Sequence, residues 1–300
     1  MKIFFTGGSG FIALPIVRKL LEKGHHVKVL DLRKPALEHK NLEFVKKSVN
    51  EDIIQDIKGC DYVMHFAAIL GVDNSDNHPL DTMRVNLEGS VNVFKSAIKA
   101  GARNMIYSSS SEVYGEPREL PIKEDSTKGP VSTYGVSKLA SEIYAKAFNK
   151  EFGSDIRIVR FFNVYGPGQL DNWVVPIFLK RAANNEMITV FGQGNQTRCF
   201  TYVEDIADGV LVVMEKGMAG EAYNIGNTQP TTILELAQLA KEMTGSKSEI
   251  KVMGYGNETR LREREIEYRV PDITKMRALG WQPKVMVREG IKRILEARKN

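Results

Sequence analysis

The sequence predicts an α/β protein built on a doubly wound parallel sheet, with a smaller α/β lobe toward the C-terminus. In the first half of the 300-residue chain, short apolar runs alternate with stretches of helical periodicity. Helices that connect parallel strands produce this alternation. After about residue 162, Gly, Pro and Asn punctuate shorter elements. We therefore expect a first domain over 1–162 and a second lobe over 163–300, with one or two strands and a helix returning to the first domain.

The elements of the first domain can be placed in order. Strands are predicted at Ile3–Thr6, His26–Asp31, Leu42–Val45, Tyr62–Phe66, Asn104–Ser109 and Ile156–Phe161. Helices are predicted at Phe11–Lys23, Leu80–Ala100 and Ser132–Phe152. Each helical stretch is followed by a glycine, which commonly ends a helix. Helical patterns in the second lobe cover Val203–Glu215, Ile233–Thr244, Ile273–Leu279 and Val287–Ala297.

The composition is that of an ordinary globular protein, with 42% hydrophobic and 26% charged residues. No apolar run approaches the roughly 18 residues of a membrane span. Two cysteines, Cys60 and Cys199, make a disulfide scaffold implausible, so we expect a reducing cytoplasm. The net charge of +5 is spread along the chain. A nucleic-acid interface needs a clustered basic stripe, and neither such an interface nor a metal site is expected.

A glycine-rich loop, Thr6 to Ala13 (TGGSGFIA), joins the first predicted strand to the first helix. Its glycines allow a tight turn and a close approach to a pyrophosphate, and the helix N-terminus offers N–H groups to that anion. This is the arrangement of a Rossmann-type dinucleotide site. Asp31 ends the second strand, where a carboxylate can accept ribose hydroxyls and would repel the 2′-phosphate of NADP. We expect NAD; Arg33 and Lys34 keep NADP as the alternative, and Asp31 as a simple turn residue is a further one.

Tyr134 and Lys138 are spaced i, i+4 and therefore share one face of the predicted helix. A phenol has a pKa of about 10, and a neighbouring ammonium together with a positive nicotinamide favours the phenolate. The phenolate could take a proton from a substrate hydroxyl while hydride leaves the same carbon. The serine run 108–111 leaves the fifth strand where the crevice of such a sheet lies, so a serine there could bridge the substrate and the tyrosine.

These motifs occur in the order seen in the extended short-chain dehydrogenase/reductase family. They are the glycine loop, HFAA at 65–68, Asn86, the serine run, Tyr134 with Lys138, RFFNVYGP at 160–167, QTRCFTYVED at 196–205 and the closing segment 272–281. The chain resembles this family over essentially its whole length. The resemblance is to NAD-dependent nucleotide-sugar epimerases, dehydratases and decarboxylases, and it implies NAD as cofactor and a nucleoside-diphosphate sugar as substrate.

The resemblance also implies roles for individual residues. The catalytic group would be Ser110, Tyr134 and Lys138. The NAD contacts would be Gly7, Gly10, Phe11, Ile12, Asp31, Phe66, Ala67, Ala68, Ser108, Tyr134, Lys138 and Phe161. The nucleotide-sugar contacts would be Ser110, Asn163, Val175, Arg198 and Arg262. The two arginines would meet the diphosphate, because the planar guanidinium fork binds phosphate oxygens in pairs; a surface salt bridge is the alternative for each.

Three positions depart from the family pattern. The third glycine of the loop is Ala13, a small residue that suits the same helix–sheet contact. Where most members have an Asp that contacts adenine, this chain has Ser48, which puts that contact in doubt. The loop Ile69–Pro79 does not match the usual epimerase pattern, so the sequence does not identify the sugar.

Glu112 bears on the reaction, because it stands two residues after Ser110. In this family the sugar C4 hydroxyl is oxidised first. A 4-epimerase then needs little else, whereas a 4,6-dehydratase must remove the C5 proton and protonate the departing C6 hydroxyl. Family dehydratases and decarboxylases carry an acidic residue at this position. We therefore favour a dehydratase or a related lyase, with Glu112 as the extra acid/base, over a 4-epimerase; a structural role for Glu112 is the alternative.

Two further expectations concern class and assembly. A non-catalytic NAD(H)-binding sensor is the alternative from another class of protein. Sensors of this kind typically lack the tyrosine or the lysine, and Tyr134 and Lys138 are both present. The two long helices predicted at 80–100 and 132–152 correspond to the pair that builds a four-helix dimer interface in the family, so we expect a homodimer.

Overall fold

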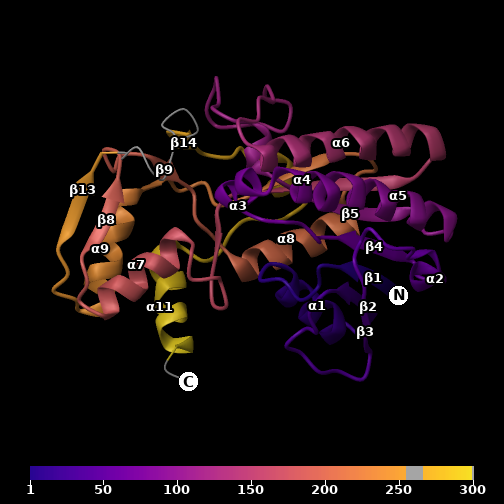
Figure 1. Ribbon diagram of the computed structural model, residues 1–300, viewed down its shortest axis with the longest axis horizontal. Coiled ribbons are helices and arrows are strands. Elements are labelled where there is room, and N and C mark those ends of the chain that lie inside the picture. The colour runs from indigo at the N-terminus through magenta and orange to yellow at the C-terminus, as the bar shows by residue number, and fades with distance from the viewer. Residues whose placement is uncertain (255–265, 299–300) are drawn as a thin grey trace.

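The main body of the protein is a seven-stranded parallel sheet (Figure 1). The computed structural model describes residues 1–254 and 266–298. The strands are β1 (Lys2–Thr6), β2 (His26–Asp31), β3 (Leu42–Lys46), β4 (Tyr62–His65), β5 (Asn104–Ser110), β6 (Asp155–Phe161) and β11 (Ala222–Ile225). Their order is β11-β6-β5-β4-β1-β2-β3, with every pair parallel. The chain switches direction between β1 and β4, which confirms the Rossmann-type doubly wound sheet.

Helices cover both faces of this sheet (Figure 1). One face packs against α1 (Ala13–Glu22) and α8 (Val203–Lys216), and the other against α5 (Gly89–Lys99) and α6 (Thr133–Phe152). Successive residues of a strand point to opposite faces, and accordingly Phe5 lies in the α1/α8 core while Phe4 lies in the α5 core. Burial on both faces explains why these strands read as continuous apolar runs.

The helix predicted at 80–100 is interrupted. It consists of α4 (Pro79–Thr82), a π-helical segment (Met83–Glu88) and α5, and it is preceded by the short helix α3 (Val72–Asn77). Asn86 lies in the π-helical segment. Segments of this kind are rare in helices and occur often at functional sites; the apolar pattern of 80–100 predicted a continuous helix and missed this one.

The second half of the chain builds a smaller lobe with its own core (Figure 1). Its elements are β7 (Val164–Tyr165), α7 (Val174–Ala183), β8 (Ile188–Phe191), β9 (Thr197–Arg198), β10 (Thr201–Tyr202), β12 (Thr231–Thr232), α9 (Ile233–Thr244), β13 (Ile250–Met253), β14 (Tyr268–Arg269) and α11 (Val287–Ala297). Strand β11 and the helices α8 and α10 (Thr274–Ala278) also come from this half, but they pack in the layers of the first domain. A boundary at residue 162 remains our proposal.

In the described parts of the chain, no helix combines the length and apolar character needed to cross a membrane.

The segment between α10 and α11 is anchored by one buried carboxylate. Asp205, in the first turn of α8, accepts the backbone N–H groups of Lys284 and Val285 at 3.0 and 2.8 Å. The indole of Trp281 donates to the carbonyl of Asp205 at 3.0 Å. Asp205 is only 4% exposed; its bond with Val285 is buried and its bond with Lys284 is partly buried.

We expect Asp205→Ala to lower the free energy of unfolding by about 2 kcal/mol, because the buried N–H of Val285 and the partly buried N–H of Lys284 lose a charged acceptor. Asp208→Ala on the same helix is the control, since Asp208 pairs with Lys19 at the surface and such pairs contribute about 1 kcal/mol or less. Urea denaturation measures both variants. Equal losses in the two would contradict this account.

Candidate active site

The glycine loop is held against the end of β4. The N–H of Gly7 donates to the carbonyl of Leu30 at 2.9 Å, and the N–H of Gly10 donates to the carbonyl of Gly7 at 3.1 Å. Gly7 has φ +73°, and a Cβ built on it would lie 2.5 Å from the backbone nitrogen of Ala67. Only glycine fits that close approach. Helix α1 begins three residues after Gly10, and no side chain caps it, so its N-terminus is suited to a pyrophosphate.

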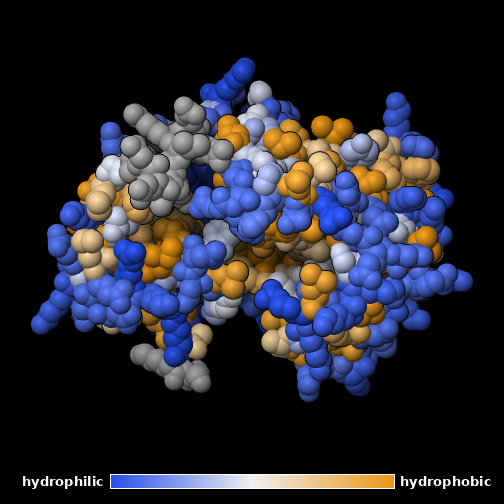
Figure 2. All heavy atoms as spheres, in the orientation of Figure 1, coloured by the Kyte–Doolittle hydropathy of each residue, from blue (hydrophilic) through white to orange (hydrophobic). Residues whose placement is uncertain are grey.

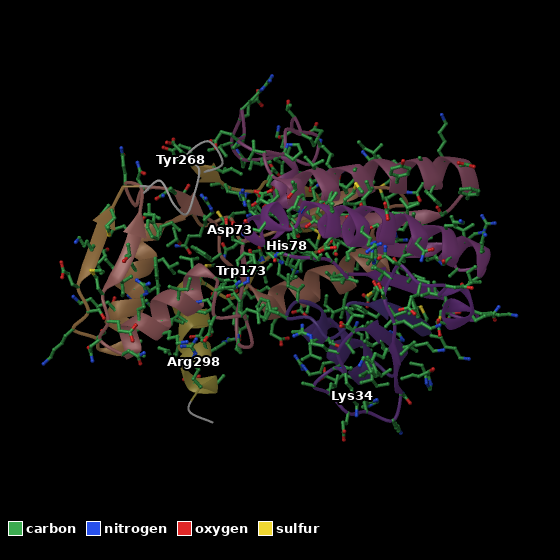
Figure 3. All side chains as sticks on the ribbon, in the orientation of Figure 1. Lys34, Asp73, His78, Trp173, Tyr268 and Arg298 are labelled. Carbon is green, nitrogen blue, oxygen red and sulfur yellow. The ribbon has the colours of Figure 1, made fainter. Side chains whose placement is uncertain are left out.

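Asp31 lies beside this loop. One oxygen of its carboxylate accepts the N–H of Ser9 and the other accepts the N–H of Arg33, both at 3.1 Å. Each carboxylate oxygen can accept more than one hydrogen bond, so the group can still take ribose hydroxyls. Lys34, the other cation considered for NADP, lies at the outer edge of the domain (Figure 3) and pairs with Glu38 at 3.6 Å. The loop and Asp31 together fit NAD.

Two of the departures from the family pattern can be located. Ala13 is 2% exposed and packs in the α1/α8 core, which explains why a small residue is needed there. The hydroxyl of Ser48 accepts the N–H of Asn50 at 3.3 Å. Ser48 therefore has a role in a turn. Whether replacing the usual Asp by Ser48 removes the contact with adenine stays a prediction.

Tyr134 and Lys138 lie together, as their spacing predicts, on the face of α6 that meets β5. The ammonium nitrogen of Lys138 donates to the carbonyl of Ser108 at 2.7 Å and lies 5.8 Å from the centroid of the Tyr134 ring. Ser110 lies close enough to Tyr134 to lower its pKa, and its hydroxyl accepts the N–H of Glu112 at 3.2 Å. Tyr134 is 9% exposed and Lys138 2%. The three proposed catalytic side chains are therefore brought together at the carboxyl end of β5.

Burial dominates the protonation of this group. Desolvation raises the pKa of Tyr134, the charge of Glu112 raises it further, and the hydrogen bond with Ser110 lowers it. Desolvation also lowers the pKa of Lys138 to about 7, against the opposing effect of Glu142. In the protein alone the pKa of Tyr134 is therefore raised, because burial penalises its charged form. The expectation that Lys138 together with the nicotinamide favours the phenolate stays a prediction.

Glu112 forms an ion pair that sequence reasoning missed. Its carboxylate accepts Nη1 of Arg269 at 2.6 Å. The side chains of Glu112 and Arg269 are 16% and 8% exposed. Arg269 lies on β14 of the second lobe, 157 residues away in sequence, and no local pattern could have linked the two. The pair joins the lobes beside Tyr134.

Apart from Ser110, four residues are predicted to contact the nucleotide sugar, and three of them lie in the described part of the chain. Asn163 has φ +29°, and its buried Oδ1 has no hydrogen-bond partner in the described structure. Arg198, on β9, is the register partner of Arg269 on β14. The side chain of Val175 is buried in the second core, so only its backbone in the first turn of α7 could meet a ligand. The prediction for Arg262 lies outside the described residues.

A hollow separates the two lobes (Figure 2). The loop 69–79 borders it from the first domain, and Figure 3 shows its residues Asp73 and His78 near Trp173 of the second lobe. A Cβ built on Gly71 would lie 4.0 Å from the Trp173 ring. The loop that departs from the epimerase pattern therefore meets the second lobe at this ring.

Next to the site lies a buried cluster of polar side chains, namely Thr6, His65, Asn86 and Ser90. Both ring nitrogens of His65 are hydrogen bonded, to Thr6 at 2.7 Å and to Ser90 at 2.9 Å. Desolvation, with a smaller effect of Lys138, lowers the pKa of His65 to about 3, so it is a neutral structural residue. Asn86 bonds to both the N–H and the carbonyl of Ile69 and thereby fixes the start of the loop 69–79. Across the described residues, no group of three or more potential metal ligands occurs.

The fold and this site define a dinucleotide-dependent enzyme with a Tyr–Lys pair. The profile of the NAD dependent epimerase/dehydratase family matches residues 3–226. The chain belongs to this family.

Three relatives show the range of activities. The chain is 34% identical to a putative UDP-glucose 4-epimerase of Methanocaldococcus jannaschii, over 99% of this chain and 98% of that protein. It is 33% identical to UDP-glucuronic acid decarboxylase 1 of Danio rerio, over 98% and 72%. It superposes with a TM-score of 0.92 on the dTDP-glucose 4,6-dehydratase DesIV of Streptomyces venezuelae, crystallised with NAD, at 28% identity over 100% and 98%. The protein is an NAD-dependent enzyme that modifies nucleoside-diphosphate sugars.

We expect Gly7→Ala to weaken NAD binding by more than about tenfold, because the new Cβ pushes the loop off Ala67. Gly24→Ala is the matched control: Gly24 also has positive φ, at +81°, but nothing lies within 4 Å of its Cβ position. This control should lose about 1 kcal/mol of stability and keep its NAD affinity. Calorimetric titration with NAD distinguishes the two, and unaltered affinity in Gly7→Ala would contradict the role of the loop.

Proposed function

We propose that the protein oxidises C4 of a nucleoside-diphosphate hexose and then catalyses an elimination, as a 4,6-dehydratase does. The observation that carries this proposal is the ion pair between Glu112 and Arg269 beside Tyr134. A 4-epimerase has no proton to move other than that of the C4 hydroxyl. A second ionised group next to the catalytic tyrosine suits a reaction with a second proton transfer.

Tyr134 and Ser110 would act on the C4 hydroxyl. Tyr134 accepts the hydroxyl proton, and Ser110, which lies close to Tyr134, positions the oxygen. Bound NAD would supply a hydride acceptor and, at the end, a hydride donor. Because burial raises the pKa of Tyr134, the phenolate requires nearby positive charge, which the ammonium of Lys138 supplies in part.

Glu112 would then move the second proton. As a carboxylate it can take the proton from C5, which the adjacent C4 ketone acidifies. The protonated Glu112 can pass that proton to the C6 oxygen, so that the C6–O bond breaks and water leaves. Arg269 keeps the carboxylate in place through the hydrogen bond of 2.6 Å.

A decarboxylase is the second candidate function, and the side-chain nitrogen Nε of Arg269 supports it. Nε of Arg269 is buried and has no hydrogen-bond partner in the described structure. A guanidinium with a free donor can bind a carboxylate, which would be the C6 carboxylate of a uronic acid. Oxidation at C4 would then release carbon dioxide from C6 with no need for a base.

The nucleotide-sugar contacts also remain part of this proposal. Arg198 and Arg269 are neighbours on adjacent strands, and two arginines side by side favour an anionic ligand such as a diphosphate. The buried Oδ1 of Asn163, which has no partner in the described structure, suits a donor from the ligand. Val175 and Arg262 are also proposed as nucleotide-sugar contacts, and for these two the resemblance to the family is the sole argument.

The test is a panel of UDP-, GDP-, dTDP- and CDP-hexoses and uronic acids, with products followed by NMR. We expect a 4-keto-6-deoxy sugar from one hexose. Carbon dioxide from a uronic acid would replace the dehydratase by the decarboxylase, and a C4-inverted sugar would reject both. Tyr134→Phe should lose about 100-fold or more of the turnover while still binding NAD. A wild-type protein that binds NAD, converts no member of the panel and behaves like Tyr134→Phe would leave the non-catalytic sensor as the better explanation.

The variant Glu112→Gln, assayed with the same panel, tests the role proposed for the ion pair of Glu112 with Arg269. We expect it to oxidise C4, seen as NADH absorbance, but to lose elimination by about 100-fold. Glu116→Gln is the matched control, because Glu116 lies in the same loop, is exposed, and accepts only the N–H of Glu267 among the described contacts. Full dehydration by Glu112→Gln would remove the argument for a dehydratase.

We also propose a cytoplasmic homodimer. Apolar side chains are exposed along α6, with Val136 at 52%, Ile143 at 61% and Tyr144 at 47%. Exposed apolar patches of this kind mark interaction surfaces. We expect light scattering at micromolar concentration to give the mass of two chains, and Ile143→Glu to reduce it to one. A monomeric wild-type protein would contradict the dimer.

A further inference from the structure

A third residue continues the row formed by Tyr134 and Lys138. Glu142 follows Lys138 by four positions on α6, so it lies on the same helix face one turn further along. It is 2% exposed. An acidic residue buried to this extent is rare unless it is paired, and the mechanism proposed above gives it no task.

The carboxylate of Glu142 is held by partners on two strands. The hydroxyl of Ser109 on β5 donates to its Oε1 at 2.5 Å. Arg160 on β6 donates from Nε at 2.9 Å and from Nη2 at 2.6 Å. Arg160 is itself 1% exposed and also donates from Nη1 to the hydroxyl of Tyr114 and the carbonyl of Glu124. The position of the carboxylate is therefore strongly determined.

The same strand that holds Glu142 also holds the proposed catalytic pair. Within three consecutive serines of β5, the carbonyl of Ser108 accepts a hydrogen bond from Lys138, the hydroxyl of Ser109 donates to Glu142, and Ser110 lies close to Tyr134. A shift of Glu142 would thus move the contacts of its two neighbours in the row.

In the part of the chain that the structure describes, the carboxylate whose charge acts on Lys138 is that of Glu142, while that of Glu112 acts on Tyr134. The ionisable groups that face it are His65 on β4, Tyr107 on β5, and Tyr134 and Glu142 on α6, with Arg160 on β6 behind Glu142. His65 is neutral, and burial raises the pKa of both tyrosines. Among the described residues, Glu142 is the group whose charge raises the pKa of Lys138.

We propose that Glu142 is a positioning residue that keeps Lys138 in its ammonium form while Tyr134 ionises. This inference rests on the role of Tyr134 and Lys138 in the proposed function. The physical reason is that a buried ammonium releases its proton easily unless a carboxylate lies nearby. A neutral Lys138 no longer stabilises the phenolate of Tyr134.

The test is the ionisation of Tyr134 in the NAD complex, which needs no sugar substrate. The near-ultraviolet absorbance of tyrosinate is titrated in each protein and corrected by its Tyr134→Phe counterpart. In Glu142→Gln we expect the midpoint to rise by about one pH unit, because Lys138 loses its proton at lower pH and no longer stabilises the phenolate.

Glu124→Gln is the matched control. Glu124 is 9% exposed and belongs to the same network, where it accepts the N–H of Asn224 at 2.9 Å. Its charge does not contribute to the pKa of Lys138. This variant should lose stability and keep the wild-type midpoint of Tyr134.

If Glu142→Gln does not fold, the double variant Glu142→Gln/Arg160→Met replaces it, since it leaves no unpaired buried charge. The same rise is expected. Equal midpoints in the wild type and the Glu142 variant, including no titration in either, would overturn the proposal, as would an equal shift in Glu124→Gln. A protein that converts no sugar nucleotide would instead refute the proposed function and leave this titration measurable.

Discussion

The carboxyl ends of β1, β4 and β5 lie at one edge of the sheet, and the proposed cofactor site depends on this alignment. In parallel register, Thr6 pairs with His65, and His65 pairs with Tyr107. The residues that follow these positions, among them Gly7 and Phe66, therefore leave the sheet at the same edge. A crevice at the carboxyl ends is a general consequence of a doubly wound sheet. It brings the glycine loop, Phe66 and the serine run 108–111 together although they lie far apart in the sequence.

Burial at that edge sets the chemistry. Two groups that must change protonation, Tyr134 and Lys138, lie almost out of contact with water. Desolvation penalises the charged form of each, which moves the two pKa values in opposite directions. In a poorly polarisable interior charges are weakly screened, so one charged neighbour can offset much of such a penalty. The carboxylate of Glu142 raises the pKa of Lys138, and the positively charged nicotinamide would favour the phenolate of Tyr134.

The second lobe contributes positively charged side chains to the site. Arg198 and Arg269 lie on neighbouring short strands that contain only two residues each. Such strands gain little from their own hydrogen bonds, and their position depends on the lobe around them. The ion pair of Arg269 with Glu112 crosses between the lobes, so the geometry at Glu112 responds to the relative position of the two.

The sequence by itself determined the sheet, the glycine loop, the Tyr134–Lys138 row and the family. Each of these depends on local periodicity or spacing, which neighbouring residues impose on one another. Only the tertiary structure showed the π-helical turn at Asn86, the ion pair of Glu112 with Arg269 and the raised pKa of Tyr134. These depend on burial and on contacts between distant segments, because desolvation and charge pairing follow distance in space and not distance along the chain.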